Sequence, residues 1–475
     1  MKSLSRIVVL VTALVLASGA LAQEGRTSAS AEPQTSPRTP QAGKVYVPES
    51  GRQQAGLFAH TTYSLRSADG GKPSAVATPR PAAVPGPLAT TEIAETPDSM
   101  GCLYVGSPKI VGCVPQYTGG PSAAGYGAIA IVDAFDNPNA ATDLSTFDSN
   151  WGLAAPPSFT KIYANGNGSC STPPPDAGWA LEESLDIEWA HVFAPNAAIV
   201  LVEACSNSYT DLFYAEQIAF SYIATNFPTT GGEVTNSWQG GEFSGQISND
   251  PLFADWNYIG GQGWKPAILA FASSGDGGFE GATTGYPSGN PWLISAGGTS
   301  VLRNASTLTF NKESCWGGSG GGTSTYETYA TSFTGGNIGP WADFQYPING
   351  GTFFPASRQT PDLSFNADPA SGVWVYSGFN GGWFIVGGTS VSSPALASIV
   401  NRAGNRLGSV FLTPVTGGSD WFSTWENNLL YSQLAAAKAY KANFYDVKTG
   451  SNGTSAVASY DLCTGVGSPR GLLGK

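Results

Sequence analysis

The sequence predicts an α/β fold, a single domain with a mainly parallel central sheet flanked by helices. Three short apolar runs, Ala128–Val132, Ala198–Val202 and Ala267–Ala272, have the length and composition of buried parallel strands. Two stretches, Ala180–Phe193 and Ser393–Ala403, have the residue spacing of helices. Strands that alternate with helices are typical of a parallel sheet, because its crossover connections place helices on both faces.

The chain divides into three segments by composition. Residues 1–22 combine a positive start, a short apolar stretch and the small-x-small pattern Ala20-Leu21-Ala22, as in a secretory signal peptide. We therefore expect a protein secreted from the cell or into a periplasm. Residues 23–100 are rich in Pro, Ser, Thr, Ala and Gly without sustained periodicity, and are predicted to be a disordered leader or short pro-segment. Residues 101–475 are uniform in character and predict the folded domain.

The charge balance excludes some classes of partner. The chain has 22 Lys and Arg against 34 Asp and Glu, a net charge of −12. An acidic protein of this kind is not expected to bind nucleic acid or an anionic membrane surface. Charged residues make up only 12% of the chain, so few ion pairs would be lost when carboxylates are protonated in acid.

Six cysteines in an exported chain predict disulfides. Cys102 and Cys113 are close in sequence and are expected to close a small loop. The other four, Cys170, Cys205, Cys315 and Cys463, would form two more bridges whose connectivity the sequence leaves open. The absence of a CxxC pair argues against a thiolate metal site.

Ser390 is the first candidate for chemistry. An apolar strand is expected to end at Val386, and glycines then form a tight turn before a helix with Pro394 in its first turn. Ser390 would lie just before that helix, with its hydroxyl exposed and main-chain N–H groups nearby to bind an oxyanion. Considered alone, such a serine would more often be a helix cap.

A histidine base for this serine is poorly supported. The chain has only His60, in the predicted leader, and His191, in a helical stretch without glycine-rich surroundings. We expect His191 to be a packed or surface residue, so a Ser-His-Asp triad is not predicted.

Carboxylates are the remaining candidate bases. Glu182 and Asp186 are four residues apart and therefore share one face of a helix. Asp276, in Ser274-Gly275-Asp276, follows the apolar run at Ala267–Ala272, at the end of a parallel strand where α/β folds place functional groups. In isolation, the first two would be read as a solvated surface and the third as a turn residue.

Together these elements resemble the sedolisin, or serine-carboxyl, peptidase family. The family's Glu-x-x-x-Asp motif matches Glu182 and Asp186, its Ser-Gly-Asp element matches Ser274 to Asp276, and its Gly-Thr-Ser-x-Ser-x-Pro motif matches Gly388 to Pro394. The resemblance covers about residues 101–475. Further similar signatures are Gly297-Gly298-Thr299, Trp316 with Gly320-Gly321-Gly322, Pro361-Asp362 and Ala367-Asp368-Pro369.

This resemblance implies a subtilisin-like fold and an acid-active endopeptidase that forms an acyl-enzyme. Ser390 would be the nucleophile, Glu182 its general base and acid, and Asp186 the group that holds Glu182. Asp276 would donate to the oxyanion beside the Ser390 N–H. A carboxyl base and a carboxyl donor can work together only where one is ionised and the other protonated, which means acidic pH.

Two more residues are candidates for the surroundings of the site. Asp133, at the end of the run Ala128–Val132, matches a position where the family often extends its carboxylate network. Trp238 resembles a family tryptophan that lines the substrate cleft. Each could equally be an ordinary strand-end or core residue.

The resemblance also implies one structural calcium ion near the C-terminus. Asp446 and Asp461 would supply carboxylates, and Val447, Val457 and Ser459 would supply main-chain carbonyls, the hard oxygen ligands that calcium prefers. Val457 and Ser459 stand where the family usually has glycine. A loop without metal is the alternative.

One departure is large, because the family usually has a long folded pro-domain and residues 23–100 are short and look disordered. This departure is the support for a second hypothesis, a non-catalytic secreted binding protein on a peptidase scaffold. A third, an aspartic peptidase, lacks the paired Asp-Thr/Ser-Gly motifs. The leading hypothesis is a monomeric peptidase whose partners are protein or peptide substrates.

Overall fold

The structure is a computed structural model, in which all described residues belong to one compact unit, Thr39–Lys475. The predicted signal peptide lies outside the described residues, as do residues 23–44 and 67–93 of the predicted leader. The described ranges are 45–66, 94–106, 113–115, 124–254, 268–304, 307–328, 345, 348, 355–404, 409–412 and 421–475.

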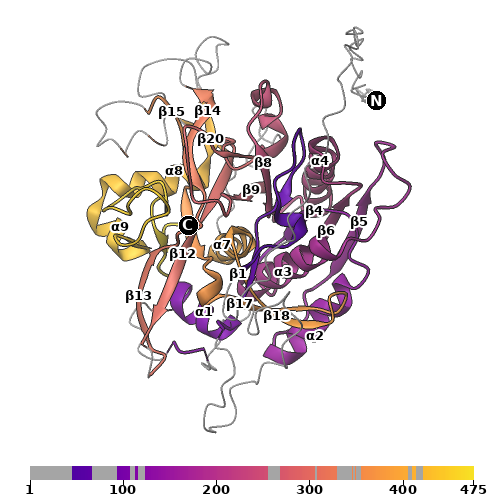
Figure 1. Cartoon of the computed structure of the whole chain (residues 1–475), viewed down its shortest axis with the longest axis horizontal. Coiled ribbons are helices and arrows are strands. Elements are labelled where there is room, and N and C mark those ends of the chain that lie inside the picture. Colours follow the sequence, from indigo (N-terminus) through magenta and orange to yellow (C-terminus); the bar gives the residue numbers. More distant parts are fainter. Residues whose placement is uncertain are drawn as a thin grey trace, which may run out of the picture. The chain divides into compact units, whose positions relative to one another are not determined.

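An eight-stranded sheet forms the centre of the unit (Figure 1). Its strands run in the order β13-β12-β9-β7-β4-β6-β5, and β16 pairs with β12 beside this path. All neighbouring pairs except β12 and β13 are parallel, which confirms the predicted mainly parallel sheet. The bounds are β4 Ala128–Ala134, β5 Phe159–Ala164, β6 Ala198–Ala204, β7 Gly232–Asn236, β9 Ile268–Ser273, β12 Leu293–Arg303, β13 Phe310–Cys315 and β16 Leu363–Asn366.

Helices cover both faces of this sheet. In β4, Ala130 and Val132 belong to the apolar cluster that includes α4, whereas Ile129 and Ile131 belong to the cluster that includes α2 and α3. Alternate side chains of a strand point to opposite faces, so burial on both faces explains the continuous apolar runs in the sequence. The helices are α1 Pro97–Tyr104, α2 Ala140–Trp151, α3 Ala177–Phe193, α4 Tyr209–Asn226, α7 Thr389–Ala403, α8 Trp425–Ser432 and α9 Ala437–Asn443.

Smaller sheets surround the central one. A four-stranded sheet has the order β1-β3-β18-β17, and two three-stranded sheets have the orders β11-β8-β2 and β10-β14-β15. Their bounds are β1 Val45–Tyr46, β2 His60–Thr61, β3 Ser64–Arg66, β8 Trp238–Gly241, β10 Phe279–Gly281, β11 Gly285–Tyr286, β14 Gly321–Thr328, β15 Ser357–Thr360, β17 Val373–Ser377 and β18 Gly382–Gly387. Two further sheets have two strands each, β19 Ser409–Leu412 with β20 Trp421–Thr424 and β21 Phe444–Tyr445 with β22 Ser468–Pro469.

The expectation that the leader is unstructured is wrong for residues 45–66 and 94–100. β2 pairs with β8 and β3 pairs with β18, so residues of the leader are built into the sheets of the domain. α1 begins at Pro97, where Thr96 and Ser99 form a capping box. These leader strands are two or three residues long, too short to show a period in the sequence, and they are held by pairing with distant strands.

The predicted helix after the glycine turn begins earlier than expected. α7 starts at Thr389 rather than after Ser390, so Ser390 lies in its first turn and Pro394 lies inside the helix. The strand before it, β18, ends at Gly387, one residue beyond the expected end at Val386.

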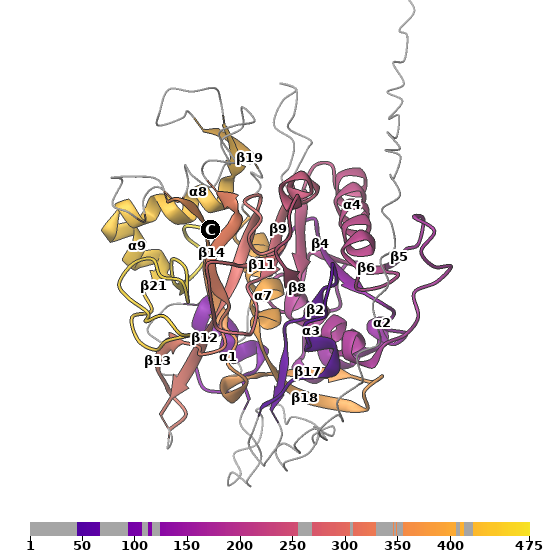
Figure 2. The same cartoon turned by 45° about the horizontal axis from the view of Figure 1, so that its top comes forward.

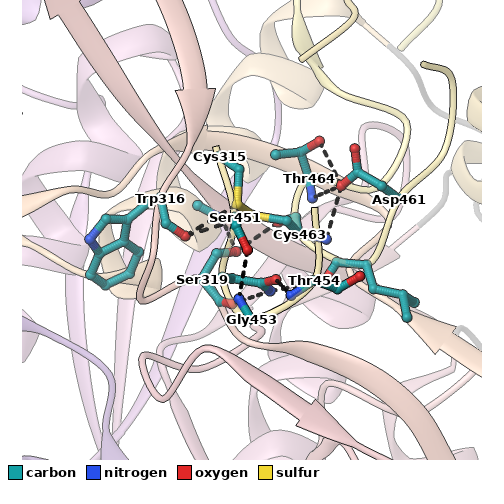
Figure 3. Close-up of a disulfide and its surroundings, with 12 residues drawn as sticks. Cys315, Trp316, Ser319, Ser451, Gly453, Thr454, Asp461, Cys463 and Thr464 are labelled. Carbon is teal, nitrogen blue, oxygen red and sulfur yellow. Dashed lines mark hydrogen bonds between the residues drawn. A yellow bond between two sulfur atoms is a disulfide. The ribbon is translucent and has the colours of Figure 1, made fainter. Parts of the chain in front are cut away.

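Three disulfides join the six cysteines. Cys102–Cys113 closes the expected small loop, and the pairs left open by the sequence are Cys170–Cys205 and Cys315–Cys463. The last bridge fastens the C-terminal loop to the end of β13, where the Ser319 hydroxyl also donates to the Cys463 carbonyl at 2.7 Å (Figure 3). Within the described part of the chain, every helix is too short or too polar to span a membrane.

Candidate active site

The turn between β18 and α7 places Ser390 at the centre of the molecule. Gly388 has a φ of +112°, and a Cβ there would lie 2.3 Å from Thr62 O and 2.6 Å from Asp276 Oδ2. Only glycine fits both this backbone conformation and this close approach. The Ser390 side chain is fully buried, and its N–H, which has no partner inside the first helical turn, donates to Thr62 O at 3.0 Å.

Ser237, between β7 and β8, contacts Ser390 from two sides. The Ser390 hydroxyl donates to Ser237 O at 3.2 Å, and the Ser237 hydroxyl donates to Ser390 O at 3.3 Å. The second bond has a clear cause, because Pro394 has no N–H to donate to the Ser390 carbonyl four residues earlier. The proline inside α7 therefore leaves a carbonyl that Ser237 binds.

Glu182 and Asp186 lie one turn apart on α3, and both are fully buried. The Asp176 side chain caps the start of this helix through the N–H groups of Gly178 and Trp179. Ser390 and Asp186 lie near enough to Glu182 to shift its pKa, and Ser237 and Glu182 do the same to Asp186. The four carboxyl oxygens of Glu182 and Asp186 are buried and have no hydrogen-bond partner among the described residues. The structure thus brings the predicted nucleophile and both predicted carboxyl groups into one cluster.

The protonation of this cluster is set by burial. Burial, and then the neighbouring Asp186 and Asp133, raise the pKa of Glu182 well above its usual value, and the nearby Ser390 side chain opposes this rise. Burial also raises the pKa of Asp186, against the nearby Ser237 and Glu182 side chains, which favour its ionised form. Buried like charges cannot all ionise together. The carboxyl groups of this cluster therefore share protons over a pH range above the one in which free carboxyl groups titrate.

Asp133 faces the same cluster. It is two residues beyond Ile131 in β4 and therefore on the α3 face of the sheet. Burial raises its pKa well above the usual value, followed by the charges of Asp186 and Glu203. A role for Asp133 in extending the carboxylate network stays a prediction.

Asp276 lies beyond β9, in the loop that faces the start of α7. Its Oδ1 accepts from Thr389 N at 2.8 Å and from Thr389 Oγ1 at 3.0 Å. Its Oδ2 is buried, has no hydrogen-bond partner among the described residues and faces Gly388 beside Thr62 O. Burial raises the pKa of Asp276 to about 7, so in acid Oδ2 carries a proton that it can donate.

Trp238 has a packing position in β8. Its side chain is fully buried, and its indole N–H donates to Val132 O at 2.9 Å. Its main chain pairs with Thr61 of the neighbouring strand β2. The expectation that its ring lines a cleft is untested, and β8 itself borders the site.

The two histidines lie outside this cluster. His191 is buried in α3, its Nε2 lies 2.8 Å from Ala154 O, and burial lowers its pKa to about 4. His60 lies in β2, not in an unstructured leader, and its Nδ1 lies 3.0 Å from Thr61 O.

Sequence reasoning missed several residues of the site. Glu203 pairs with Asp133 in the register of β4 and β6, and Lys161 Nζ lies 2.8 Å from it. Burial raises the pKa of Glu203 to about 7, against the effect of Lys161. Glu183 also joins this set, since its pKa is raised by burial and then by Glu203 and Asp133. The sequence held a signal for Glu203, because it is the one acid in the apolar strand Ala198–Ala204. It held no such signal for Thr62 or Ser237.

Asp461, one predicted calcium ligand, accepts four hydrogen bonds from its own loop. Its Oδ1 accepts from Cys463 N, Thr464 N and Thr464 Oγ1 (Figure 3). Its Oδ2 accepts from Val457 N at 3.1 Å. This arrangement holds the carboxylate in place at the turn that carries Val457.

Asp446, the other predicted carboxylate ligand, contacts the same loop. Its Oδ1 accepts from Ser459 N at 2.9 Å and from the Tyr440 hydroxyl, which also contacts Ser459 O at 3.3 Å. Ser459 has a φ of +73°, the left-handed region that favours the glycine expected there. The other oxygen, Oδ2, pairs with the exposed Lys448 at 3.0 Å, and the buried Val447 follows.

The oxygen ligands around this loop are of the chemical types that calcium binds. It offers two carboxylates and main-chain oxygens, which are hard ligands. The described part of the chain holds no cluster of three or more Asp, Glu, His or Cys side chains placed for a metal, so carbonyl groups would complete the coordination. Lys448 can leave Asp446 readily, because an exposed ion pair contributes little.

The chain is similar to known proteins in sequence and in fold. The chain is 28% identical over 355 residues to kumamolisin from Bacillus sp. (strain MN-32), which takes in 70% of this chain and 56% of that protein. It is similar to the structure of Pseudomonas sedolisin, a serine-carboxyl proteinase complexed with two molecules of pseudo-iodotyrostatin. That similarity has a TM-score of 0.57 at 21% identity and covers 80% of this chain and 96% of that chain. A further structure, sphericase, has a TM-score of 0.46 at 14% identity, over 80% and 99% of the two chains.

No family model matches the chain. The chain spans a little over half the length of the curated relative it matches. The similarity to Pseudomonas sedolisin shows the fold and confirms the expected subtilisin-like α/β architecture. The resemblance indicated by the sequence motifs is confirmed by these two proteins.

Proposed function

We propose that this protein is a secreted, acid-active serine-carboxyl endopeptidase that hydrolyses peptide bonds in proteins through an acyl-enzyme on Ser390. The observation that carries the proposal is the environment of Ser390. Its hydroxyl belongs to one buried cluster with Glu182 and Asp186, while its N–H donates to the carbonyl oxygen of an extended polypeptide strand. The kumamolisin relative and the serine-carboxyl proteinase fold support the same reaction.

Each residue has a role in this proposal. Glu182 takes the Ser390 proton as the hydroxyl attacks a peptide carbonyl, and later returns it to the leaving amine. Asp186 holds Glu182 and shares its proton, with Asp133 adjoining them. The Ser390 N–H and the protonated Oδ2 of Asp276 bind the oxyanion.

Acidic pH suits this chemistry for a physical reason. Asp276 can donate only while protonated, and burial raises its pKa to about 7. The base must at the same time carry a negative charge shared among Glu182, Asp186 and Asp133. Both conditions hold when the shared set has lost one proton and Asp276 has kept its own.

The remaining assignments are part of the same proposal. Protein or peptide chains are the substrates, and the molecule acts as a monomer. One calcium ion binds at Asp446 and Asp461, with main-chain oxygens of Val447, Val457 and Ser459, and stabilises the C-terminal loop without entering the reaction.

The test is hydrolysis of denatured casein or haemoglobin from pH 2 to 8 by the wild type and by Ser390→Ala. We expect activity that peaks below about pH 5, where carboxyl groups share protons, and that vanishes in the variant. A folded protein with no activity at any pH would refute the proposal and favour the binding scaffold. Activity that survives in Ser390→Ala would refute the serine mechanism.

A further inference from the structure

A row of charged side chains runs across the central sheet, from the candidate base to the edge strand β5. Asp133 of β4 pairs in register with Glu203 of β6, which pairs in turn with Tyr163 of β5. Lys161 lies two residues before Tyr163 and therefore points to the same face of the sheet. β5 ends the strand order of this sheet, and Figures 1 and 2 show β4, β6 and β5 following one another toward its edge. The row thus joins the buried cluster around Ser390 to the edge of the sheet.

Helix α3 covers this row. Leu201, two residues before Glu203, belongs to the apolar cluster that contains Ile187 of α3. Glu183 lies one turn before Ile187, on the same stripe of the helix, and therefore faces the sheet. Burial, followed by the charges of Glu203 and Asp133, raises the pKa of Glu183 well above its usual value. Glu183 thus adds a third buried carboxyl group to the row.

Lys161 is the cation at the edge of the row. Its Nζ lies 2.8 Å from Glu203 Oε1, donates to Asn137 O at 2.8 Å and pairs with Asp136. It also lies 5.3 Å from the centre of the Tyr163 ring. Burial lowers the pKa of Lys161, but Asp136 and Glu203 outweigh burial and raise it overall. A positive charge is therefore held in a fixed place between the edge strand and the buried acids.

In acid this positive charge is not cancelled by Glu203. Burial raises the pKa of Glu203 to about 7, against the effect of Lys161, so Glu203 is protonated in acid. Its Oε1 accepts from Asn137 N at 3.1 Å, whereas its Oε2 is buried and has no hydrogen-bond partner among the described residues. The charge of Lys161 consequently acts on Asp133 and on the carboxyl groups beyond it.

We propose that Lys161 is a positioning residue for the candidate base, whose positive charge lets the buried carboxyl groups of Glu182, Asp186 and Asp133 hold a negative charge in acid. Lys161 would thereby set the lower pH limit of activity without touching Ser390 or the substrate. This inference rests on the proposed function and adds to it a residue that lies outside the motifs of the sedolisin resemblance.

The burial of Glu203 supports this role over a merely structural one. An ion pair that only fastened the edge strand would be complete with Asp136 and Asn137 O, which already bind Lys161. Glu203 instead lies fully buried between Lys161 and Asp133, with one oxygen on Lys161 and the other left without a partner among the described residues. The row is thus continuous from the cation to the base.

The size of the effect follows from the spacing of the strands. Two steps of about 4.8 Å separate β4 from β5, so the charge acts over roughly 10 Å. At this distance and an effective dielectric constant of about 20, one unit charge shifts the titration of a carboxyl group by about one pH unit. Lys161 has 22% of its side chain exposed, so solvent reduces the shift.

The test compares the wild type with Lys161→Met, Lys161→Arg and Asp136→Asn. The initial rate of hydrolysis of denatured haemoglobin, at a concentration well below KM, is measured from pH 2 to 8. We expect Lys161→Met to move the acid limb upward by about half to one pH unit, and Lys161→Arg, which keeps the charge, to retain the wild-type limb. Asp136→Asn removes the negative charge beside Lys161 and should move the limb downward.

The matched control is Lys312→Met, because Lys312 lies on β13, the edge strand at the opposite end of the same sheet. It removes the same charge and should leave the acid limb in place. Circular dichroism and urea unfolding check that each variant is folded. If Lys161→Met does not fold, Lys161→Gln replaces it, since the glutamine amide is uncharged and can still donate to Asn137 O.

The outcomes separate this inference from the proposed function. An active wild type whose acid limb is unchanged in folded Lys161→Met, or shifts equally in Lys161→Met and Lys312→Met, overturns the inference alone. So does a shift in the same direction in Lys161→Met and Asp136→Asn, because opposite charges must act with opposite signs. A folded wild type without activity at any pH overturns both.

Discussion

Ser237 binds Ser390 through both of its own polar groups, accepting from the Ser390 hydroxyl at 3.2 Å and donating to the Ser390 carbonyl at 3.3 Å. The same side chain lies near Asp186 and favours its ionised form. One small residue therefore connects the candidate nucleophile, the first turn of α7 and the candidate base pair.

We predict that Ser237→Ala lowers kcat/KM by about tenfold and moves the acid limb of the pH profile upward. Loss of the Ser237 hydroxyl raises the pKa of Asp186, so the carboxyl groups that act as the base become charged at higher pH. It also leaves the Ser390 carbonyl unpaired, at a cost of about 1–3 kcal/mol in the free energy of unfolding.

Peptide hydrolysis from pH 2 to 7 and thermal unfolding measure the two effects. The matched control is Ser398→Ala, a serine of α7 that is also buried and whose hydroxyl donates to Ala395 O and Trp189 O. A Ser237→Ala profile that keeps its wild-type acid limb would contradict the link to Asp186.

A second prediction concerns Asp276. In Asp276→Asn the amide N–H₂ can donate to an oxyanion at every pH, and the amide oxygen can still accept from Thr389. We expect this variant to retain measurable activity and to lose the decline near pH 7 that deprotonation of Asp276 causes. Asp276→Ala, which removes the donor, should lower kcat by about 10²–10³-fold.

The measurement is kcat across pH 3 to 8 for both variants and the wild type. Equal loss of activity in Asp276→Asn and Asp276→Ala would show that Asp276 does not act as an oxyanion donor. Unfolding curves in urea check that both variants are folded.

The sequence predicted the central sheet, since β4, β6 and β9 are buried on both faces and read as continuous apolar runs. It also predicted the residues of the cluster, because their motifs occur in a specific order. The leader strands escaped prediction for a physical reason. β2 and β3 are two and three residues long and are defined by partners about 180 and 320 residues away, a relation that local periodicity cannot express.

The contacts of the site were likewise hidden from the sequence. Ser237 binds Ser390 because Pro394 frees a carbonyl, and Thr62 reaches Ser390 because the chain between β2 and β3 passes Gly388. Both follow from tertiary packing of segments that no local pattern links. Glu203 could have been predicted from the sequence, because a lone acid inside an apolar buried strand needs an explanation.

A third prediction concerns calcium at the C-terminal loop. If calcium binds there, 5 mM CaCl₂ should raise the midpoint of thermal unfolding by a few degrees relative to 5 mM EGTA, because a ligand of the folded state stabilises it by mass action. Asp461→Asn removes one carboxylate charge and should abolish the difference. Differential scanning calorimetry at pH 5.5 measures it.

The control for calcium is Asp368→Asn, because Asp368 caps the short helix at Pro369–Ser371, away from this loop. A wild type that melts at the same temperature with calcium and with EGTA would contradict the site. A calcium effect that persists in Asp461→Asn would place the ion elsewhere.

The last prediction is that the folded protein is more stable in acid than at neutral pH. Burial raises the pKa of Asp148, Glu203 and Glu327 to about 7 and of Glu216 to about 8. A carboxyl group with a folded-state pKa above its unfolded value contributes stability that is fully present below about pH 4.5 and is lost as pH rises through the folded-state pKa. The free energy of unfolding should therefore fall between pH 4.5 and 8.

Glu216 gives the sharpest test of this dependence. It is fully buried in α4, and among the described residues Asn236 alone donates to it, at 3.4 Å. Glu216→Gln removes the charge at similar shape, so it should be near neutral at pH 4 and should stabilise the protein by about 1–3 kcal/mol at pH 8, since each pKa unit corresponds to about 1.4 kcal/mol. Urea unfolding at both pH values measures this, with the exposed Glu49→Gln as control. A stabilisation that is equal at pH 4 and pH 8 would show that Glu216 is not protonated in the folded state.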